Sequence, residues 1–564
     1  MSDSISESQE SAKSVATIRE VKGVKSQYLV NVFGGWLNVV INALFSSLIL
    51  PINLHFLGKD TLSVSVVASS ILFLLHYLNF GLSPTLLRFF SRAIADKDYE
   101  EIKKTSSTAQ LLTCGLGLLG ALIFLAFMLL FYCDLYNVPD DLRFSVLRPA
   151  ELIRSPLFIL FCGMAFSFVE SFYTITFGSI LQGCQRLDYL NYIRSSSVIL
   201  RVILLCVCYT FVSRTLASLG LVIFLIAAFR VVVQFLLARR LCGNSIIFSY
   251  RYVDFSLIPK FFSFGVLAFT NSICMALSIQ IPVQLIGIEM TRSAVVDFGA
   301  ANHISSFLGT ILAAVVVPLT PLAYSEAKKG GNRLGAWATS IGQVVSCFGC
   351  CALLVLWLFG TEWYTAWLGP QFAWVRDLSV ILASGIVLAS VQQTNFTIAL
   401  GADTIAPIAF SSIVMAILVS ATTYIGLHWS LFGLTGVVWT IAAIRFVRNV
   451  VFIAAVYAKR FHYNYFDYTL RVYVLPLCAA IAVGFLWKFT VGRYDLTEFR
   501  LEIERLLAAL STRSSINTRL SYAIIATLQS AVASVVFLIF CWFTFVHKDL
   551  KKSLFEVLRK KFRR

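Results

Sequence analysis

Long apolar runs separated by short polar stretches extend along most of the chain. The runs are continuous rather than alternating with a period of two, which is typical of membrane-spanning helices and not of barrel strands. The fourteen spans that we expect are 28–56, 61–87, 108–133, 156–184, 193–213, 215–238, 258–287, 293–323, 335–361, 377–401, 405–427, 431–458, 468–490 and 518–546. The polar tail 1–27 and the basic tail 547–564 are expected to lie outside the membrane.

Composition supports lipid as the solvent of this chain. Hydrophobic residues make up 58% of the 564 residues and charged residues only 13%, and the mean hydropathy is +0.81. A water-soluble protein of this length could not hide so much apolar surface. In lipid only helices and closed barrels satisfy their own backbone hydrogen bonds, so the expected fold is an all-α polytopic membrane protein.

The basic residues predict an orientation. If the N-terminus is cytoplasmic, most of the 46 Lys and Arg residues fall in inner loops and tails, including Lys103 with Lys104 and Arg239 with Arg240. This asymmetry follows the positive-inside rule and places both termini in the cytoplasm. The net charge of +17 is then a topology signal and requires no nucleic acid. The basic tail is expected to lie on anionic lipid headgroups.

A five-residue motif occurs twice within the apolar runs. Ile226–Arg230 is followed four residues later by Gln234, and Ile441–Arg445 is followed four residues later by Asn449. On a helix this spacing places an arginine and an amide on one face. The repetition indicates that the chain arose by duplication of one half.

Two further matches occur in the same order along the chain. They are the equally spaced pairs Gly34 with Pro51 and Gly265 with Pro282, and the span ends Leu181–Gly183 and Ala399–Gly401. The duplication predicts an N-lobe at 28–240 and a C-lobe at 257–460, each of six spans. Because six is even, the lobes should be parallel repeats about a pseudo-two-fold axis along the membrane normal. Segment 468–546 adds two C-terminal helices and, near 495–511, an outer amphipathic helix.

Permanent positive charge inside the membrane is a functional-site hypothesis, because charge is costly there. Arg445, Arg448 and Asn449 share a helix face and would suit a pyrophosphate, since guanidinium binds phosphate oxygens in pairs. Arg230 and Arg201 are further candidates for the same role. The alternative is structural pairing of these arginines, with Glu170 or with backbone carbonyls of a neighbouring helix.

Carboxylates within the spans are candidates for ion coupling. Glu170 lies near the middle of its span and is either a proton or cation coupling site or the partner of Arg201 or Arg230 in a salt bridge; we favour the salt bridge. Asp297 and His303 are weaker coupling candidates, because a spacing of six does not place them on one helix face.

Neutral amides within the spans form a third group. Sugar hydroxyls need donors and acceptors of this kind, and so many amides would destabilise a dry bundle. The cavity candidates are Asn38, Asn42, Asn79, Asn271, Gln280, Gln392 and Gln393. Interhelical hydrogen bonding is the alternative for any single one. Lys25 and Arg88 flank the expected cytoplasmic mouth and could steer a pyrophosphate there.

Two sequence features argue against a metal site and against ATP hydrolysis through a phosphate loop. The triplet Cys347, Cys350 and Cys351 lies inside a span without a neighbouring His or carboxylate, so we expect packing rather than a metal site. A G-x-x-x-x-G-K-[ST] phosphate loop is absent from the sequence, which excludes ATP hydrolysis by that route. We expect no cofactor.

Several segments resemble the multidrug/oligosaccharidyl-lipid/polysaccharide exporter superfamily, and within it the bacterial oligosaccharide flippases that translocate O-antigen repeat units. The segments are the Asn-rich first span with Leu57–Asp60, then Leu78–Leu82, Arg88–Arg92, the inner loop Asp96–Lys104, and the connection from Leu181–Gly183 to Arg194. The resemblance implies a fourteen-span, two-lobe fold in a bacterial cytoplasmic (inner) membrane. It also implies export of polyprenyl-pyrophosphate-linked oligosaccharide by alternating access, alongside polysaccharide polymerases or glycosyltransferases as partners.

Three functions remain open at this point. The leading one is a flippase for lipid-linked oligosaccharide, which is not an enzyme. The second is a multidrug or cation-coupled exporter of the same fold, although its relatives use an acidic residue in the first span and 28–56 here contains none. The third is an integral-membrane glycosyltransferase or polysaccharide polymerase, which should carry a large outer loop with catalytic residues.

Overall fold

Helices form almost the whole of the described chain, and the described residues contain no strand. The computed structural model describes residues 24–79, 81–96, 98–136, 149–184, 186–262, 266–316, 333–401, 404, 406–490 and 514–544. The expected amphipathic helix near 495–511 and the basic tail 547–564 lie outside the described residues. The chain divides into two compact units, with the main boundary between Phe269 and Thr270 and residues 291–293 assigned to the first unit.

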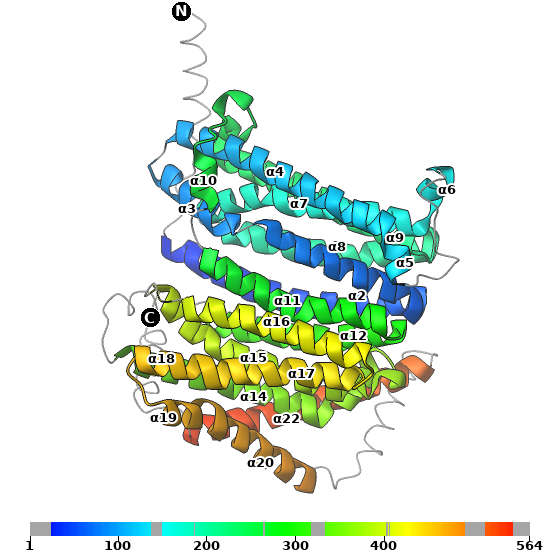
Figure 1. Cartoon of the computed structure of the whole chain (residues 1–564), viewed down its shortest axis with the longest axis vertical. Helices are drawn as coiled ribbons and strands as arrows, with labels where there is room; N and C mark the ends of the chain where they lie inside the picture. Colours follow the sequence, from blue (N-terminus) through cyan, green and yellow to red (C-terminus); the bar gives the residue numbers. More distant parts are fainter. Residues whose placement is uncertain are drawn as a thin grey trace, which may run out of the picture. The chain divides into compact units, whose positions relative to one another are not determined.

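The first unit contains the helices of the expected N-lobe (Figure 1). They are α2 (Val24–Leu75), α3 (Leu82–Ala95), α4 (Tyr99–Leu130), α5 (Tyr132–Leu135), α6 (Pro149–Arg154), α7 (Pro156–Gly183), α8 (Leu187–Phe211), α9 (Leu216–Cys242) and α10 (Leu257–Phe262), with short 3₁₀ turns at 76–79, 243–246 and 250–252. Helix α7 packs against both α4 and α9, and α2 packs against α8.

The second unit contains the helices of the expected C-lobe and the appended pair. They are α11 (Val266–Glu289), which begins just before the boundary, α12 (Arg292–Val316), α14 (Arg333–Trp367), α15 (Val375–Gly401), α16 (Ala406–His428), α17 (Leu434–Phe446), α18 (Ala454–Arg460), α19 (Tyr465–Thr469), α20 (Leu475–Thr490) and α22 (Ser514–Thr544). Two π-helices, Val447–Ile453 and Leu470–Val474, join α17 to α18 and α19 to α20. Helix α14 packs against α15, α20 and α22.

Among the described residues, eleven helices are long and apolar enough to cross a membrane. Helix α2 counts as one of these eleven. Gly58, at φ +76°, kinks it at the polar turn that separates the expected spans 28–56 and 61–87. With that division, and with α12 and the apolar stretch Ala523–Leu538 of α22, the helices follow the fourteen expected segments in order.

The expected span 61–87 is wrong in one respect, because its helix stops at Leu75. A 3₁₀ turn follows, and the Asn79 side chain accepts a 3.0 Å hydrogen bond from the N–H of Gly81. Gly81 has φ +75°, a left-handed conformation that suits glycine, and α3 then begins at Leu82. Hydropathy does not detect this break, because every residue around it is apolar or neutral.

Close packing of α7 on α9 depends on two glycines. A Cβ on Gly163 would come within 2.2 Å of the Gly220 carbonyl oxygen, and one on Gly220 within 2.6 Å of the Leu160 Cα. Small residues at such crossings let helix backbones approach closely in membranes. This approach brings the charged side chains further along α7 and α9 within reach of one another.

Candidate functional site

The second unit buries two arginines of one helix. Arg445, near the end of α17, is 2% exposed, and Arg448, in the following π-helix, is 7% exposed. A π-helix inserts an extra residue into the helical turn, and such insertions occur often at functional sites. Both guanidinium groups donate to residues of α11, Ser278 and Asn271, so they share a face as their spacing predicted.

Arg448 is held by neutral oxygen atoms from three elements. Its Nη1 donates to Asn449 Oδ1 at 2.9 Å, and its Nη2 donates to Asn271 Oδ1 of α11 at 3.1 Å and to Ser412 Oγ of α16 at 2.5 Å. The Ser412 hydroxyl in turn donates to Asn271 Oδ1 at 2.6 Å. These contacts fix the Arg448 guanidinium in place without neutralising its charge.

Arg445 has fewer hydrogen-bond partners than Arg448. Its Nη2 donates to Ser278 Oγ of α11 at 3.3 Å, while its Nε and Nη1 are buried without a hydrogen-bond partner. Gly385 of α15 faces its stem, since a Cβ there would lie 3.1 Å from Arg445 Cδ. The Arg445 side chain therefore has two unused hydrogen-bond donors, and its stem packs closely against the backbone at Gly385.

No carboxylate pairs with Arg445 or Arg448 among the described residues. A buried, unpaired cation is costly, so a polypeptide retains one where something else supplies the opposite charge. Arg448 Nε and Asn449 Nδ2 are also buried without a partner. The four unused donors of this triad, which we call the Arg445 cluster (Arg445, Arg448 and Asn449), suit an anion with several oxygen atoms.

The π-helix is supported from the far side by a polar network. Gln392 of α15 donates to the Asn449 carbonyl oxygen at 2.8 Å and to Tyr473 Oη at 2.6 Å. Asn395 donates to Gln392 Oε1 at 2.7 Å. Both hydrogens of the Gln392 amide are thus used to hold the backbone that carries the cluster, which is a positioning role within the fold.

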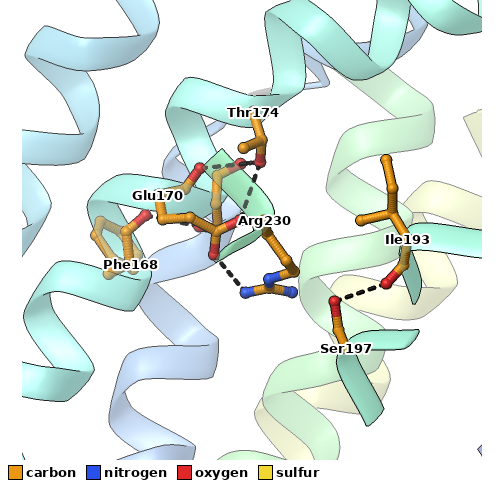
Figure 2. A network of polar contacts seen from close by, with 7 residues as sticks. Phe168, Glu170, Thr174, Ile193, Ser197 and Arg230 are labelled. Carbon is orange, nitrogen blue, oxygen red and sulfur yellow. Dashed lines mark hydrogen bonds and ion pairs between the residues drawn. The ribbon is translucent and has the colours of Figure 1, made fainter. Parts of the chain in front are cut away.

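The first unit contains the other copy of the motif, and there the arginine is paired. Arg230 Nη2 of α9 forms a short ion pair with Glu170 Oε2 of α7, as Figure 2 shows. Thr174 Oγ1 donates to the Glu170 carbonyl oxygen at 2.9 Å and lies 3.4 Å from Oε1. The ion pair expected between Glu170 and Arg230 is therefore present.

Two arginines of α8 surround this pair with further positive charge. Arg201 is half-buried with its Nε unpaired, and Arg194 is exposed; both lie close enough to Arg230 to repel it. The single carboxylate of Glu170 cannot balance three guanidinium groups. The first unit therefore also carries excess positive charge within its helices.

The two copies of the motif differ in one residue of the partner helix. Glu170 lies thirteen residues before Gly183, at the end of α7, and the residue thirteen before Gly401, at the end of the matching α15, is Leu388. Leu388 is half-buried and packs on an apolar cluster. The repeat thus keeps the arginine in both halves and its acidic partner in only one.

The predicted amides fall into different surroundings. In the first unit, Asn42 donates to Asn38 Oδ1 at 2.7 Å, and Ser195 donates to the same oxygen at 3.1 Å. Asn79 completes the turn before Gly81. Gln280 of α11 is half-buried, and Gln393 is exposed.

The remaining candidates are not brought together. Asp297 is 4% exposed on α12, and the His303 ring stacks on Trp367 with centroids 5.7 Å apart. Arg88 is exposed on α3. Lys25 lies in the first turn of α2, and its side chain lies outside the described residues.

The cysteine triplet packs in an apolar cluster of the second unit. Cys347, Cys350 and Cys351 of α14 lie with Cys541 of α22 and Phe537 in this cluster. The described residues contain no group of three or more His, Cys, Asp or Glu side chains placed to hold a metal ion.

Sequence reasoning missed three parts of the sites. Ser412 and Ser278 supply hydroxyls to the arginines, and Arg194 adds charge beside Arg230. Serines are common in membrane helices, so their role shows only when the neighbouring helix is placed. Arg194 lies where the sequence predicts the end of the connection before a span, but its spacing of seven from Arg201 places both on one face of α8.

Comparisons with known proteins bear on the fold. No protein-family model and no curated protein matches the chain. The chain is similar in structure to an inward-facing multidrug resistance MATE family transporter of the MOP superfamily, at 15% identity with a TM-score of 0.60 over 80% of this chain and 97% of that one.

Two further solved structures agree. The chain is similar to the lipid II flippase MurJ in its inward closed conformation, at 10% identity with a TM-score of 0.62 over 91% of this chain and 99% of that one. It is similar to the eukaryotic MATE transporter AtDTX14, at 15% identity with a TM-score of 0.56 over 78% of this chain and 97% of that one. The chain therefore has the helical membrane fold that the MATE transporters share with the lipid II flippase MurJ.

Proposed function

We propose that this chain is a secondary transporter that flips a polyprenyl-pyrophosphate-linked oligosaccharide across a bacterial cytoplasmic membrane by alternating access. One observation carries the proposal: Arg445 is buried with two unused donors and no carboxylate partner among the described residues. A pyrophosphate supplies the missing negative charge and accepts paired hydrogen bonds from guanidinium. The fold supports transport, because it is shared with transporters and a flippase.

Neutral groups close to the cluster suit the saccharide. Asn271 of α11 is half-buried beside Arg448, and amides are among the groups that bind sugars, whereas Ser278 and Ser412 are fully buried and hold the arginines. Such a substrate is made by glycosyltransferases on the inner face and is used by a polymerase or transferase on the outer face. Enzymes of these classes are therefore the partners that we propose.

Export of organic cations is less well supported by the site. Such a substrate needs a carboxylate inside the membrane; Glu170 is already engaged by Arg230, which leaves the buried Asp297 of α12 as the other candidate named from the sequence. Three arginines around Glu170 would repel a cation in the first unit, and two unneutralised arginines would repel it in the second.

A reconstitution experiment tests the proposal. Proteoliposomes would contain the full chain and a fluorescent polyprenyl-pyrophosphate oligosaccharide, and an impermeant quencher would report how much of it changes leaflet with time. We expect faster exchange than in protein-free vesicles. A phosphatidylcholine with the same fluorophore should not exchange, and ethidium should not accumulate. Transport of ethidium without movement of the oligosaccharide would reject the proposal in favour of cation export.

A further inference from the structure

A short ordered segment joins α9 to α10 within the first unit. It runs from Gly243, after α9, to Ser256, before α10, and contains the two 3₁₀ turns 243–246 and 250–252. This segment plays no part in either arginine site. We call it the 243–256 segment.

Side chains of α4 clamp the segment in place. Gln110 Nε2 donates to the Ile246 carbonyl oxygen at 2.8 Å, and the N–H of Asp254 donates to Thr108 Oγ1 at 2.9 Å. The N–H of Ser249 donates to Ser107 Oγ at 3.3 Å. Four consecutive polar residues of α4, Thr105–Thr108, are fully buried beneath it. These hydrogen bonds fix the segment on the side of α4.

The length of α4 places the segment at the edge of the membrane. Its 32 residues span about 48 Å at about 1.5 Å per residue, whereas the hydrocarbon core is about 30 Å thick. The polar first turns of α4 must therefore emerge from the core. The segment packs on those turns, and it also follows Arg239 and Arg240 at the end of α9, so it lies at headgroup level.

The outward side chains of the segment are of two kinds. Four large apolar ones are exposed: Ile247, Phe248, Tyr250 and Phe255, with Tyr250 at 71%. Beside them a shallow, open depression of about 450 Å³, which we call the cavity of the segment, is lined by Lys104, Arg251 and residues 252–256. Lys104 and Arg251 are exposed and form no ion pair among the described residues.

The charge around the cavity is mainly positive. Lys103 lies 5.1 Å from the centre of the Tyr252 ring, and Lys260 follows in α10. Asp254 is the one acidic residue of the lining. Hydrogen bonds from Ser256, with help from Lys260 and Lys104, lower the pKa of Asp254, so it stays ionised at neutral pH. The lining therefore contains one carboxylate and two cations, Lys104 and Arg251.

We propose that the 243–256 segment binds the phosphate headgroup of an anionic phospholipid in the cytoplasmic leaflet. Lys104 and Arg251 pair with the phosphate, while Phe248, Tyr250 and Phe255 lie among the upper acyl chains. Exposed aromatic side chains next to basic ones at headgroup level match the anionic interface in both polarity and charge. The proposal is independent of the transported substrate.

Lipid titration of the purified full chain tests this site. Phosphatidylglycerol and phosphatidylcholine, each labelled on an acyl chain, would be titrated into delipidated protein in detergent, with bound fluorescence as the readout. We expect preference for phosphatidylglycerol. The double variant Lys104→Gln/Arg251→Gln should lose roughly thirty-fold in affinity for it, about five-fold for each cation removed.

The matched control is Arg239→Gln/Arg240→Gln, which removes two exposed cations at the same end of the unit. It should lower the affinity much less than the double variant Lys104→Gln/Arg251→Gln does, because neither residue lines the cavity. Equal losses in both variants, or equal binding of the two lipids, would overturn the proposal. Competition by inorganic phosphate as strong as by the lipid would show a site for free phosphate instead. All four side chains are exposed, so the variants should keep the thermal stability of the native chain.

Discussion

A single carboxylate separates the two copies of the arginine motif. Glu170 neutralises Arg230 in the first unit, whereas Arg445 has no such partner among the described residues of the second. Removing one member of a buried pair usually destabilises a protein strongly, because the remaining charge is left unpaired. The second unit already contains that state, and the proposed ligand of Arg445 would supply the missing negative charge.

Substitution of Arg445 should therefore separate transport from stability. Arg445→Gln removes the charge but keeps a polar side chain, and transport of the lipid-linked oligosaccharide should fall about 10- to 100-fold. Thermal stability in detergent should rise, because an unpaired buried charge is removed. Arg445→Lys should keep more transport than Arg445→Gln, since it keeps the charge and loses only the paired donors. A loss of both transport and stability in Arg445→Gln would indicate a structural role.

The opposite result is expected at Glu170. Glu170→Gln leaves Arg230 without its ion pair and should lower stability by about 2 kcal/mol, a moderate value because the Arg230 side chain is 34% exposed. The double variant Glu170→Gln/Arg230→Gln should recover most of that loss, as measured by thermal unfolding in detergent. If the double variant is less stable than Glu170→Gln, the two residues do not act as a pair.

Between the helices, the duplication is visible in matching contacts. Ser195 of α8 donates to Asn38 of α2, and Ser412 of α16 donates to Asn271 of α11. Both serines follow the span-end glycines Gly183 and Gly401 at nearly the same distance. The fifth helix of each half thus bonds to the first in the same way, a correspondence between the halves that supports a common origin.

A substitution at Leu388 tests whether position 388 of α15 corresponds to Glu170 of α7. Leu388→Glu places a carboxylate at the position in α15 that matches Glu170 in α7, one turn from Gly385, which faces Arg445. A carboxylate there should pair with Arg445 and compete with the substrate, so transport should fall at least about ten-fold. Leu388→Gln has nearly the same size without the charge and should keep most of the transport. Equal transport by the two variants would show that position 388 does not reach Arg445.

Periodicity and charge predicted the helical fold and the order of its spans, because apolar length alone decides where a chain can cross lipid. They did not predict the break at Gly81 or the π-helix at Val447–Ile453, since both depend on backbone geometry. The arginines were recognisable because charge is rare in lipid. Their serine partners and the role of Gln392 in holding the π-helix depend on which helices are neighbours, and a single sequence does not contain that information.

On the scale of the whole molecule, the orientation of the chain in the membrane decides which leaflet each site faces. The 243–256 segment packs on the first turns of α4, so the loops before α4 and after α9 lie at one end of the first unit. This agrees with the expectation that both loops lie on the same side of the membrane, because four spans, an even number, lie from α4 to α9. The basic residues of both loops then face the same side.

Reporter fusions test that orientation directly. Alkaline phosphatase, which is active only outside the cytoplasmic membrane, should be active when fused after Arg214, between α8 and α9, and inactive when fused after Arg251. A fluorescent protein that matures in the cytoplasm should give the reverse pattern. Both positions lie in short connections that flank α9, so one helix separates the opposite outcomes. Alkaline phosphatase activity of the fusion after Arg251 would show that the chain has the opposite orientation, with the 243–256 segment at the outer leaflet. The lipid site would then need an outer-leaflet ligand, and the substrate would have to enter from the other side.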